Sequence, residues 1–237
     1  MSLEWIPKLL NITKYRDTGK LSRGLKFSFQ PESELLIIKM PSGAHEIPHL
    51  ILVEDFLIAF RALGISRSGY SWIGGSRYQG RGPASPRSKE GDQAFLPAGR
   101  TYLANFPSVV VEVGVSESMP MLRRDAAFWL THSANECRLV VIISVNRSSR
   151  YMVYELWSLG SVPGLITRAN PNPAPHIEPI RPQQTVIQSG GATIGPPDLQ
   201  FTLTVLFDNN LANVNMQQSV QITNADLCFF FRFGSFI

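Results

Sequence analysis

Two acidic residues have the types and spacing that could bind a metal ion. Glu112 stands in the middle of the apolar segment FPSVVVEVGVSES, residues 106–118, and Asp92 lies twenty residues earlier in KEGDQAFLP, residues 89–97. The valine-rich run predicts a strand that is buried on both faces. A carboxylate there must be paired, hydrogen-bonded or bound to a cation, because an unpaired buried charge is costly. Two acids at the ends of adjacent strands are what a divalent metal needs from a protein.

The elements expected around these acids alternate between strand and helix. Residues 108–115, 119–133 and 138–145 predict a strand, a helix and a second strand, which places two parallel strands at the centre of a sheet. A helix from about Ile47 to Leu63 precedes them. Further strands are expected at 35–40, 70–74, 93–96, 151–158, 185–187 and 200–207. The pattern predicts an α/β fold with a central mixed sheet, a βαβ core and flanking helices.

Composition divides the chain into three parts. Residues 1–33 are mixed and polar and predict a lead-in, and residues 34–160 hold the expected core. Residues 161–237 begin with a proline-rich stretch at 171–182, which predicts a linker or wrapping arm before late strands that pack on the core. The end, 227–237, is rich in aromatic residues, so it is either a last packed element or an exposed apolar segment.

Composition, charge and cysteine content exclude several classes of protein. A chain of 237 residues with 44% hydrophobic residues can form one substantial core, and a net charge of +4 permits an anionic partner without requiring one. Two cysteines exclude a disulfide scaffold and a cysteine-rich zinc site. The start, MSLEWIPKLLN, lacks the apolar core of a signal peptide, and no run reaches membrane-spanning length. We therefore expect an intracellular protein, in the cytoplasm or nucleus.

One basic segment could contact nucleic acid. No acidic residue occurs between Asp55 and Glu90, whereas aromatic and basic residues alternate there: Arg61, Arg67, Tyr70, Trp72, Arg77, Tyr78, Arg81, Arg87 and Lys89. Such a segment can follow a phosphate backbone and stack bases. The same pattern also fits a solvated loop whose aromatic residues are structural, and the sequence favours this second interpretation slightly.

A second motif, His45-Glu-Ile-Pro-His49, matches the H-E-x-x-H signature of zinc metalloproteases. That chemistry needs both histidines one turn apart on a helix. Pro48 opposes this arrangement, because proline in a helix interior costs about 3 kcal/mol. The sequence therefore predicts that the helix begins near Pro48, that His45 lies in the preceding loop, and that the motif does not bind zinc.

The order of the segments around Asp92 and Glu112 resembles that of the PD-(D/E)XK, or restriction-endonuclease-like, nucleases. The sequence looks most like their Uma2-type branch and related uncharacterised fungal proteins. The resemblance covers roughly residues 35–160 and is carried by the segments KEGDQAFLP at 89–97, FPSVVVEVGVS at 106–116, LRRD at 122–125 and the strand at 138–146. It implies a metal-dependent nuclease that cleaves phosphodiester bonds in DNA. By this resemblance, Asp92, Glu112 and the main-chain carbonyl of Val113 would hold Mg²⁺ or Mn²⁺.

The sequence departs from the family pattern at two positions. Gly91 replaces the proline before the first acid, and Gly114 stands where the catalytic lysine is expected. Arg123 and Arg124 on the following helix are the best substitutes for neutralising phosphate charge, although arginine is a poor base. Glu54 or Asp55 could add a third carboxylate. The alternative, that both belong to the solvent face of an amphipathic helix, is favoured.

Two other functions stay open. Without the lysine, the protein could be a non-catalytic module of the same fold that binds nucleic acid or another protein. It could also be a structural or assembly protein whose aromatic C-terminal segment docks on a partner. The retained acids favour the nuclease, and the missing lysine favours the non-catalytic module.

Overall fold

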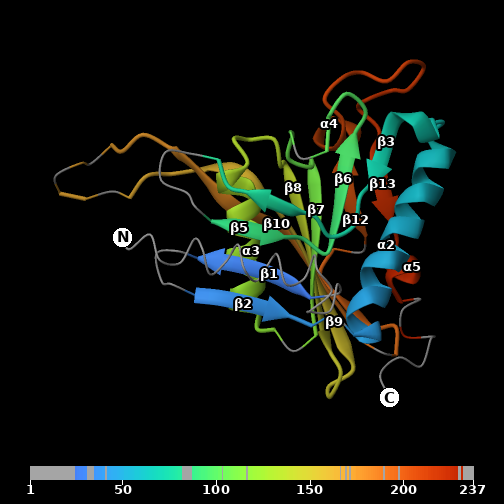
Figure 1. Cartoon of the computed structure of the whole chain (residues 1–237), viewed down its shortest axis with the longest axis horizontal. Helices are drawn as coiled ribbons and strands as arrows, with labels where there is room; N and C mark the ends of the chain where they lie inside the picture. The colour runs from blue at the N-terminus through green and yellow to red at the C-terminus, as the bar shows by residue number, and fades with distance from the viewer. Residues whose placement is uncertain are drawn as a thin grey trace, which may run out of the picture.

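The architecture is α/β, with a seven-stranded mixed sheet and a few helices packed on it (Figure 1). The structure is a computed structural model. It describes residues 25–30, 35–40, 42–81, 87–102, 104–115, 117–165, 167–168, 170, 172–188, 190–196, 198–228 and 231. No helix in these ranges is both long enough and apolar enough to cross a membrane.

The large sheet has the strand order β11-β10-β9-β8-β7-β6-β3. Its strands are β3 (Tyr70–Trp72), β6 (Gln93–Pro97), β7 (Val109–Gly114), β8 (Leu139–Asn146), β9 (Tyr151–Val162), β10 (His176–Gln188) and β11 (Thr193–Ile194). Strands β7 and β8 are parallel, and the neighbouring pairs are antiparallel. Helix α3 (Met119–His132) connects β7 to β8, as the predicted βαβ unit requires.

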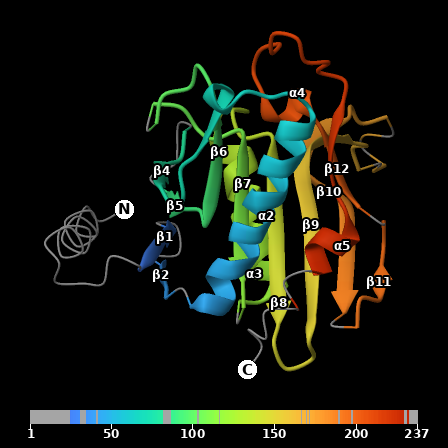
Figure 2. The same ribbon diagram turned by 90° about the vertical axis from the view of Figure 1, so that its right-hand side faces the viewer.

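Two long helices cover opposite faces of this sheet (Figure 2). Because side chains alternate along β7, Val109, Val111 and Val113 pack in one apolar cluster, together with Phe56 and Phe60 of α2 (Gly43–Ala62). The opposite face of β7 presents Val110 and Glu112 toward α3, where Leu122, Ala126 and Trp129 form a second cluster with Val110. Glu112 is therefore the one charged residue of a strand that is buried on both faces, as the sequence predicts.

Helix α2 begins earlier than the sequence predicts. It runs from Gly43 to Ala62 with Pro48 inside it, so the expectation that it starts near Pro48 was wrong. Pro48 removes only one main-chain donor, and it lies in the second turn of a twenty-residue helix. The burial of Leu52, Phe56 and Phe60 offsets that loss.

A second sheet of four strands lies beside α3, with the order β2-β1-β5-β4 (Figure 1). Its strands are β1 (Lys26–Gln30), β2 (Leu35–Lys39), β4 (Arg77–Gln79) and β5 (Ser88–Glu90). Thus part of the predicted polar lead-in, Lys26–Gln30, is a strand that pairs with β2 and β5. The turn from β5 to β6 passes from the small sheet to the large one, and Asp92 lies in this turn.

The proline-rich stretch is mostly strand rather than linker. β10 includes Pro179 and Pro182 and pairs with β9 along most of its length, so the prediction of a linker or arm across 171–182 was wrong from His176 onward. The pairing register shifts between Ile180 and Gln183, where Pro182 lies, which agrees with the tolerance of β-bulges for proline. The expected short strand at 185–187 is the end of β10.

The last described segment packs on the α2 side of the large sheet. It contains β12 (Leu199–Thr202), α4 (Leu203–Leu206), β13 (Ser219–Ile222) and α5 (Asn224–Cys228). The remaining short element, the 3₁₀ turn η2 (Arg67–Gly69), lies earlier in the chain, just before β3. β12 and β13 form a separate two-stranded sheet. Of the aromatic C-terminal residues, most lie outside the described ranges, while Leu227 is buried in the core.

Candidate functional site

Asp92 is fixed by the turn that joins the two sheets. The residue before it, Gly91, packs so closely that an added Cβ would lie 3.0 Å from Val110 Cγ1, which explains a glycine rather than a larger residue there. The Asp92 carboxylate is buried. Its Oδ2 accepts a 2.6 Å hydrogen bond from the main-chain nitrogen of Val113, and its Oδ1 lies 2.7 Å from Lys26 Nζ. The turn therefore holds this carboxylate against β7, beside Glu112.

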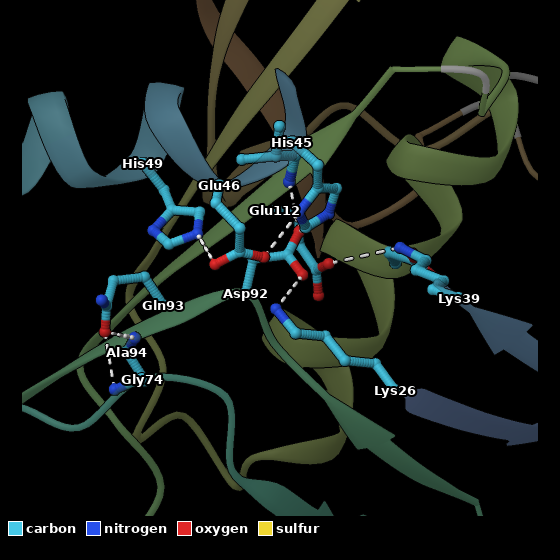
Figure 3. Close-up of polar contacts among 12 residues, drawn as sticks. Lys26, Lys39, His45, Glu46, His49, Gly74, Asp92, Gln93, Ala94 and Glu112 are labelled. Carbon is cyan, nitrogen blue, oxygen red and sulfur yellow. Dashed lines mark hydrogen bonds and ion pairs between the residues drawn. The ribbon is translucent and has the colours of Figure 1, made fainter. Parts of the chain in front are cut away.

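Glu112 points from β7 toward α3 and is fully buried. Trp129 Nε1 donates a 2.6 Å hydrogen bond to Glu112 Oε1, and Lys89 Nζ lies 3.4 Å from the same oxygen. Lys39 Nζ is 3.6 Å from Oε2, which has no hydrogen-bond partner among the described residues. Figure 3 shows the carboxylates of Asp92 and Glu112 next to each other, with Lys26 and Lys39 pointing toward them. The structure thus brings the two predicted acids together.

Lysines from three strands surround these acids. Lys26 comes from β1, Lys39 from β2 and Lys89 from β5. Lys39 Nζ also lies 2.8 Å from Glu117 and 3.2 Å from Asp125, and Lys89 Nζ lies 2.6 Å from Asp125. The result is a network of ammonium groups and carboxylates between the small sheet, β7 and α3. We call it the acid–lysine cluster; its members are Lys26, Lys39, Lys89, Asp92, Glu112, Glu117 and Asp125.

The pKa values of the two central acids, Asp92 and Glu112, are shifted in opposite directions. Burial opposes ionisation of Asp92, yet His45 and Lys26 hold the pKa of this carboxyl well below its usual range. Burial raises the pKa of Glu112 to about 7, although Lys89 and Lys39 act against this rise. Despite its burial, Lys39 has a raised pKa because Glu112 and Asp125 stabilise its charge. The cluster therefore holds one firmly ionised carboxylate beside one that gains a proton easily.

The absence of lysine at position 114 has a packing reason. A Cβ on Gly114 would lie 2.8 Å from Leu122 Cδ1, so the side chain of Leu122 occupies the space that a residue at 114 would need. Lys39 supplies an ammonium group to Glu112 from a different strand. A positive charge thus lies beside the acids although position 114 does not supply it.

Arg123 and Arg124, the two arginines expected to neutralise phosphate charge, lie in different surroundings. Arg123 forms two hydrogen bonds to the buried Glu155 of β9, at 3.1 Å and 2.6 Å, and this pairing directs it away from the acid–lysine cluster. Arg124 is exposed and contacts Met121 Sδ. It also lines a pocket of about 280 Å³ with Lys89 and Asp125 of the cluster. The geometry therefore keeps Arg124 near the site and assigns Arg123 to the anchoring of α3 on β9.

Other predicted contributors lie elsewhere. Glu54 is exposed, and Asp55 interacts with Asp226 of α5, so the described contacts do not give the site a third carboxylate from this part of α2. Tyr70 and Tyr78 of the basic segment are buried in the two apolar clusters, and Trp72 is partly buried against the first, so all three aromatic residues have structural roles. Asp125 of α3, which the sequence does not indicate as a ligand, is buried in the acid–lysine cluster.

The H-E-x-x-H motif forms the first turns of α2. His45 and His49 lie on one face of the helix and are buried, contrary to the prediction that His45 lies in a loop. Glu46 contacts both rings, at 3.1 Å from His45 Nδ1 and 3.0 Å from His49 Nε2. His45 Nε2 lies 3.2 Å from Asp92 Oδ2, so the motif adjoins the acid–lysine cluster (Figure 3).

Sequence reasoning missed the lysines and Trp129 as partners of Glu112. A lysine at the end of an apolar strand, as in LLIIK at 35–39, gives a weak signal, because its side chain usually reaches solvent. Lys89 lies three residues before Asp92, but only the pairing of β5 with β1 and β4 turns it inward. No local pattern identifies these contacts, since each joins side chains of two different elements, even where the elements are consecutive, as β7 and α3 are for Glu112 and Trp129.

No family model matches the sequence of this chain, and no curated protein is significantly similar to it.

Proposed function

We propose that this protein is a metal-dependent nuclease that cleaves phosphodiester bonds in DNA, built on a restriction-endonuclease-like core. The observation that carries the proposal is the 2.6 Å hydrogen bond from the Val113 main-chain nitrogen to Asp92 Oδ2. It fixes one buried carboxylate against the strand that presents the second, Glu112. Two acids that the protein buries side by side are suited to share a cation.

The order of elements supports this core. Around the large sheet, helix α2 precedes the antiparallel strands β3, β6 and β7, and α3 and the parallel strand β8 follow them. This is the order that the resemblance to the PD-(D/E)XK nucleases implies. Asp92 precedes β6 and Glu112 lies on β7, which are the places of the two acids in that family's pattern.

The residues present fit a divalent metal. Glu112 Oε2 is a buried carboxylate oxygen without a hydrogen-bond partner among the described residues, as expected for an atom that awaits a ligand. The pairing of β6 with β7 ends at Val111, and beyond it the Val113 N–H binds Asp92. Because a strand residue directs its N–H and C=O to the same side, the Val113 carbonyl faces the side of Asp92. Asp92, Glu112 and this carbonyl would hold Mg²⁺ or Mn²⁺.

The bound cation would polarise the scissile phosphate and lower the pKa of a water molecule. The chain's own cations do the remaining electrostatic work. Lys39 Nζ, 3.6 Å from Glu112 Oε2, would stabilise negative charge at the phosphate, in place of a lysine at position 114. Arg124, on the neighbouring pocket, would neutralise an adjacent phosphate of the backbone.

One observation favours a second function, that of a non-catalytic nucleic-acid-binding module. Lys26 pairs with Asp92 at 2.7 Å, and Lys39 and Lys89 lie within 3.6 Å of Glu112. These ammonium groups neutralise the acids without a metal, and a cation would have to compete with Lys26 for Asp92 Oδ1. In this case the acid–lysine cluster would only join the two sheets.

A plasmid-nicking assay with a titration of Mg²⁺ or Mn²⁺ separates the two functions. We expect nicking that EDTA abolishes, and a loss of about 100-fold or more in Glu112→Gln, because that change removes a ligand charge and keeps the shape. Lys39→Met should also lower the rate, whereas the matched control Glu178→Gln, on the exposed part of β10, should retain it. DNA binding that weakens with salt and persists without metal, in the absence of nicking, would establish the non-catalytic module.

A further inference from the structure

One turn of α2 brings three metal-ligating side chains together outside the acid–lysine cluster. Glu46 lies between two histidine rings, with its Oε1 3.1 Å from His45 Nδ1 and its Oε2 3.0 Å from His49 Nε2. One ligand atom from each of the three residues can be chosen so that all lie within 4.8 Å of one another. Figure 3 shows both rings turned toward the Glu46 carboxylate. Their spacing follows from the helix, since residues i and i+4 share one face.

These distances suit a transition-metal ion. Zinc binds imidazole nitrogen and carboxylate oxygen at about 2.0–2.2 Å, so neighbouring ligand atoms of a tetrahedral site lie about 3.3–3.5 Å apart. The separations of 3.1 Å and 3.0 Å are near this value and involve the two different oxygens of Glu46, and the ligand atoms chosen one from each residue lie within 4.8 Å of one another. Two imidazoles favour zinc and its neighbours in the first transition row, whereas Mg²⁺ prefers oxygen ligands alone. The donor set therefore differs in kind from that of Asp92 and Glu112.

The second ring nitrogen of His45 provides independent support. His45 Nε2 is buried and lies 3.2 Å from Asp92 Oδ2, without a well-aligned hydrogen bond among the described residues. A metal on Nδ1 would place the ring proton on Nε2, facing that carboxylate. Metal-bound histidines commonly direct their other N–H to a carboxylate, which fixes the tautomer and the ring orientation. Asp92 stands where such an orienting group is needed.

The site also has an entrance. The side chains of His45 and His49 are only 9% and 3% exposed, but that of Glu46 is 41% exposed. A cation can thus reach the rings past the carboxylate, while the rings themselves stay ordered by burial. Pro48, which argues against the motif in the sequence, sits on the same helix without breaking it.

We propose that His45, Glu46 and His49 form a binding site for a Zn²⁺-class transition-metal ion, with Asp92 as the positioning residue for His45. In this arrangement Glu46 is a ligand rather than the general base that the H-E-x-x-H signature assigns to it in metalloproteases. Three protein ligands leave a fourth position for water. The proposal does not depend on nuclease activity, because it rests on different ligand atoms and a different class of metal.

The test is a Zn²⁺ titration of the full-length, chelator-treated protein, followed by calorimetry and by competition with a chromophoric chelator. We expect one Zn²⁺ per chain and no comparable binding of Mg²⁺ at this site. Glu46→Ala and His49→Ala should each weaken Zn²⁺ binding about 100-fold, and Asp92→Asn about 10- to 100-fold, as for orienting partners of ligands. His176→Gln is the matched control: it removes an exposed histidine paired with Glu178 and should leave the affinity unchanged.

Two further measurements distinguish the loss of a metal ligand from the unfolding of a variant. Glu46 is half-exposed, so Glu46→Ala should keep the circular dichroism spectrum of the parent. X-ray absorption at the zinc edge of the parent protein should show two imidazole nitrogens and a carboxylate oxygen. The proposal is overturned if Zn²⁺ does not saturate at one site, if the folded Glu46→Ala variant binds as tightly as the parent, or if the spectrum lacks imidazole. Nicking assays do not enter this decision, so the two proposals can fail separately.

Discussion

His45 Nε2 lies 3.2 Å from Asp92 Oδ2, and this short separation joins the first helix to the turn between the two sheets. Asp92 also contacts Lys26 and the main chain of Val113. One buried carboxylate thus connects α2, β1 and β7. The two proposed sites share this residue, as a ligand in one and as a positioning group in the other.

The buried carboxylate of Glu112 should be important for stability. Glu112→Ala removes the acceptor of the Trp129 N–H and a partner of Lys89, which leaves a fully buried ammonium group less well paired. Breaking a buried charge pair in this way costs about 3–5 kcal/mol in the free energy of unfolding. Urea denaturation followed by circular dichroism measures this loss. Glu112→Gln, which can still accept from Trp129, should lose less; equal stability of Glu112→Ala and the parent protein would contradict the prediction.

The close contact at Gly114 should appear as coupling between two residues. Gly114→Ala places a Cβ against Leu122 and should lower the free energy of unfolding by about 1–3 kcal/mol through overpacking. Leu122→Ala opens a cavity and should cost about 2–5 kcal/mol. In the double variant the added methyl group at position 114 fills part of the cavity that Leu122→Ala opens. The loss of unfolding free energy should therefore be smaller than the sum of the losses in the two single variants. A double-mutant cycle from denaturation curves checks this, and strict additivity would show that the contact is absent.

Asp55 should make stability depend on pH. Burial, together with Asp226 and Glu54, raises its pKa from 3.8 to about 7, and Oδ2 has no hydrogen-bond partner among the described residues. Tyr154, the other titratable group influenced by Asp55, has a pKa raised far above this range by burial and stays neutral. The folded state therefore holds the Asp55 proton more tightly than the unfolded state does. This contribution lowers stability as pH rises from about 4 to 7 and is constant above that range.

The matched variant is Asp55→Asn, which mimics the protonated form. At pH 8 it should raise the free energy of unfolding by about 1 kcal/mol, because it removes a poorly solvated charge. At pH 4 the two proteins should be nearly equal. Thermal denaturation across this range, with Glu178→Gln on the exposed part of β10 as a control, measures the difference. A gain that is the same at every pH would assign the effect to something other than ionisation of Asp55.

Local patterns in the sequence identified much of the central fold. The valine run at 109–113 indicates a buried strand, and the helix that follows it favours a parallel strand at β8, as the structure has it. Patterns failed where long-range pairing outweighed local preference. Pro48 lies inside a helix because α2 buries Leu52 and Phe56, and Pro179 and Pro182 lie in a strand because β9 pairs with β10.

The sequence by itself determined that Glu112 is a charge in an apolar strand and that Asp92 lies in a polar turn before the preceding strand. Only the tertiary structure decided what surrounds them. Lys26, Lys39 and Lys89 reach the acids from three strands of the small sheet, and the pairing of β1 with β5 joins residues about sixty positions apart, as in Ser28 with Lys89. A local motif cannot encode such contacts. They arise because a buried charge must be compensated by whichever side chains the packing of the two sheets brings within reach.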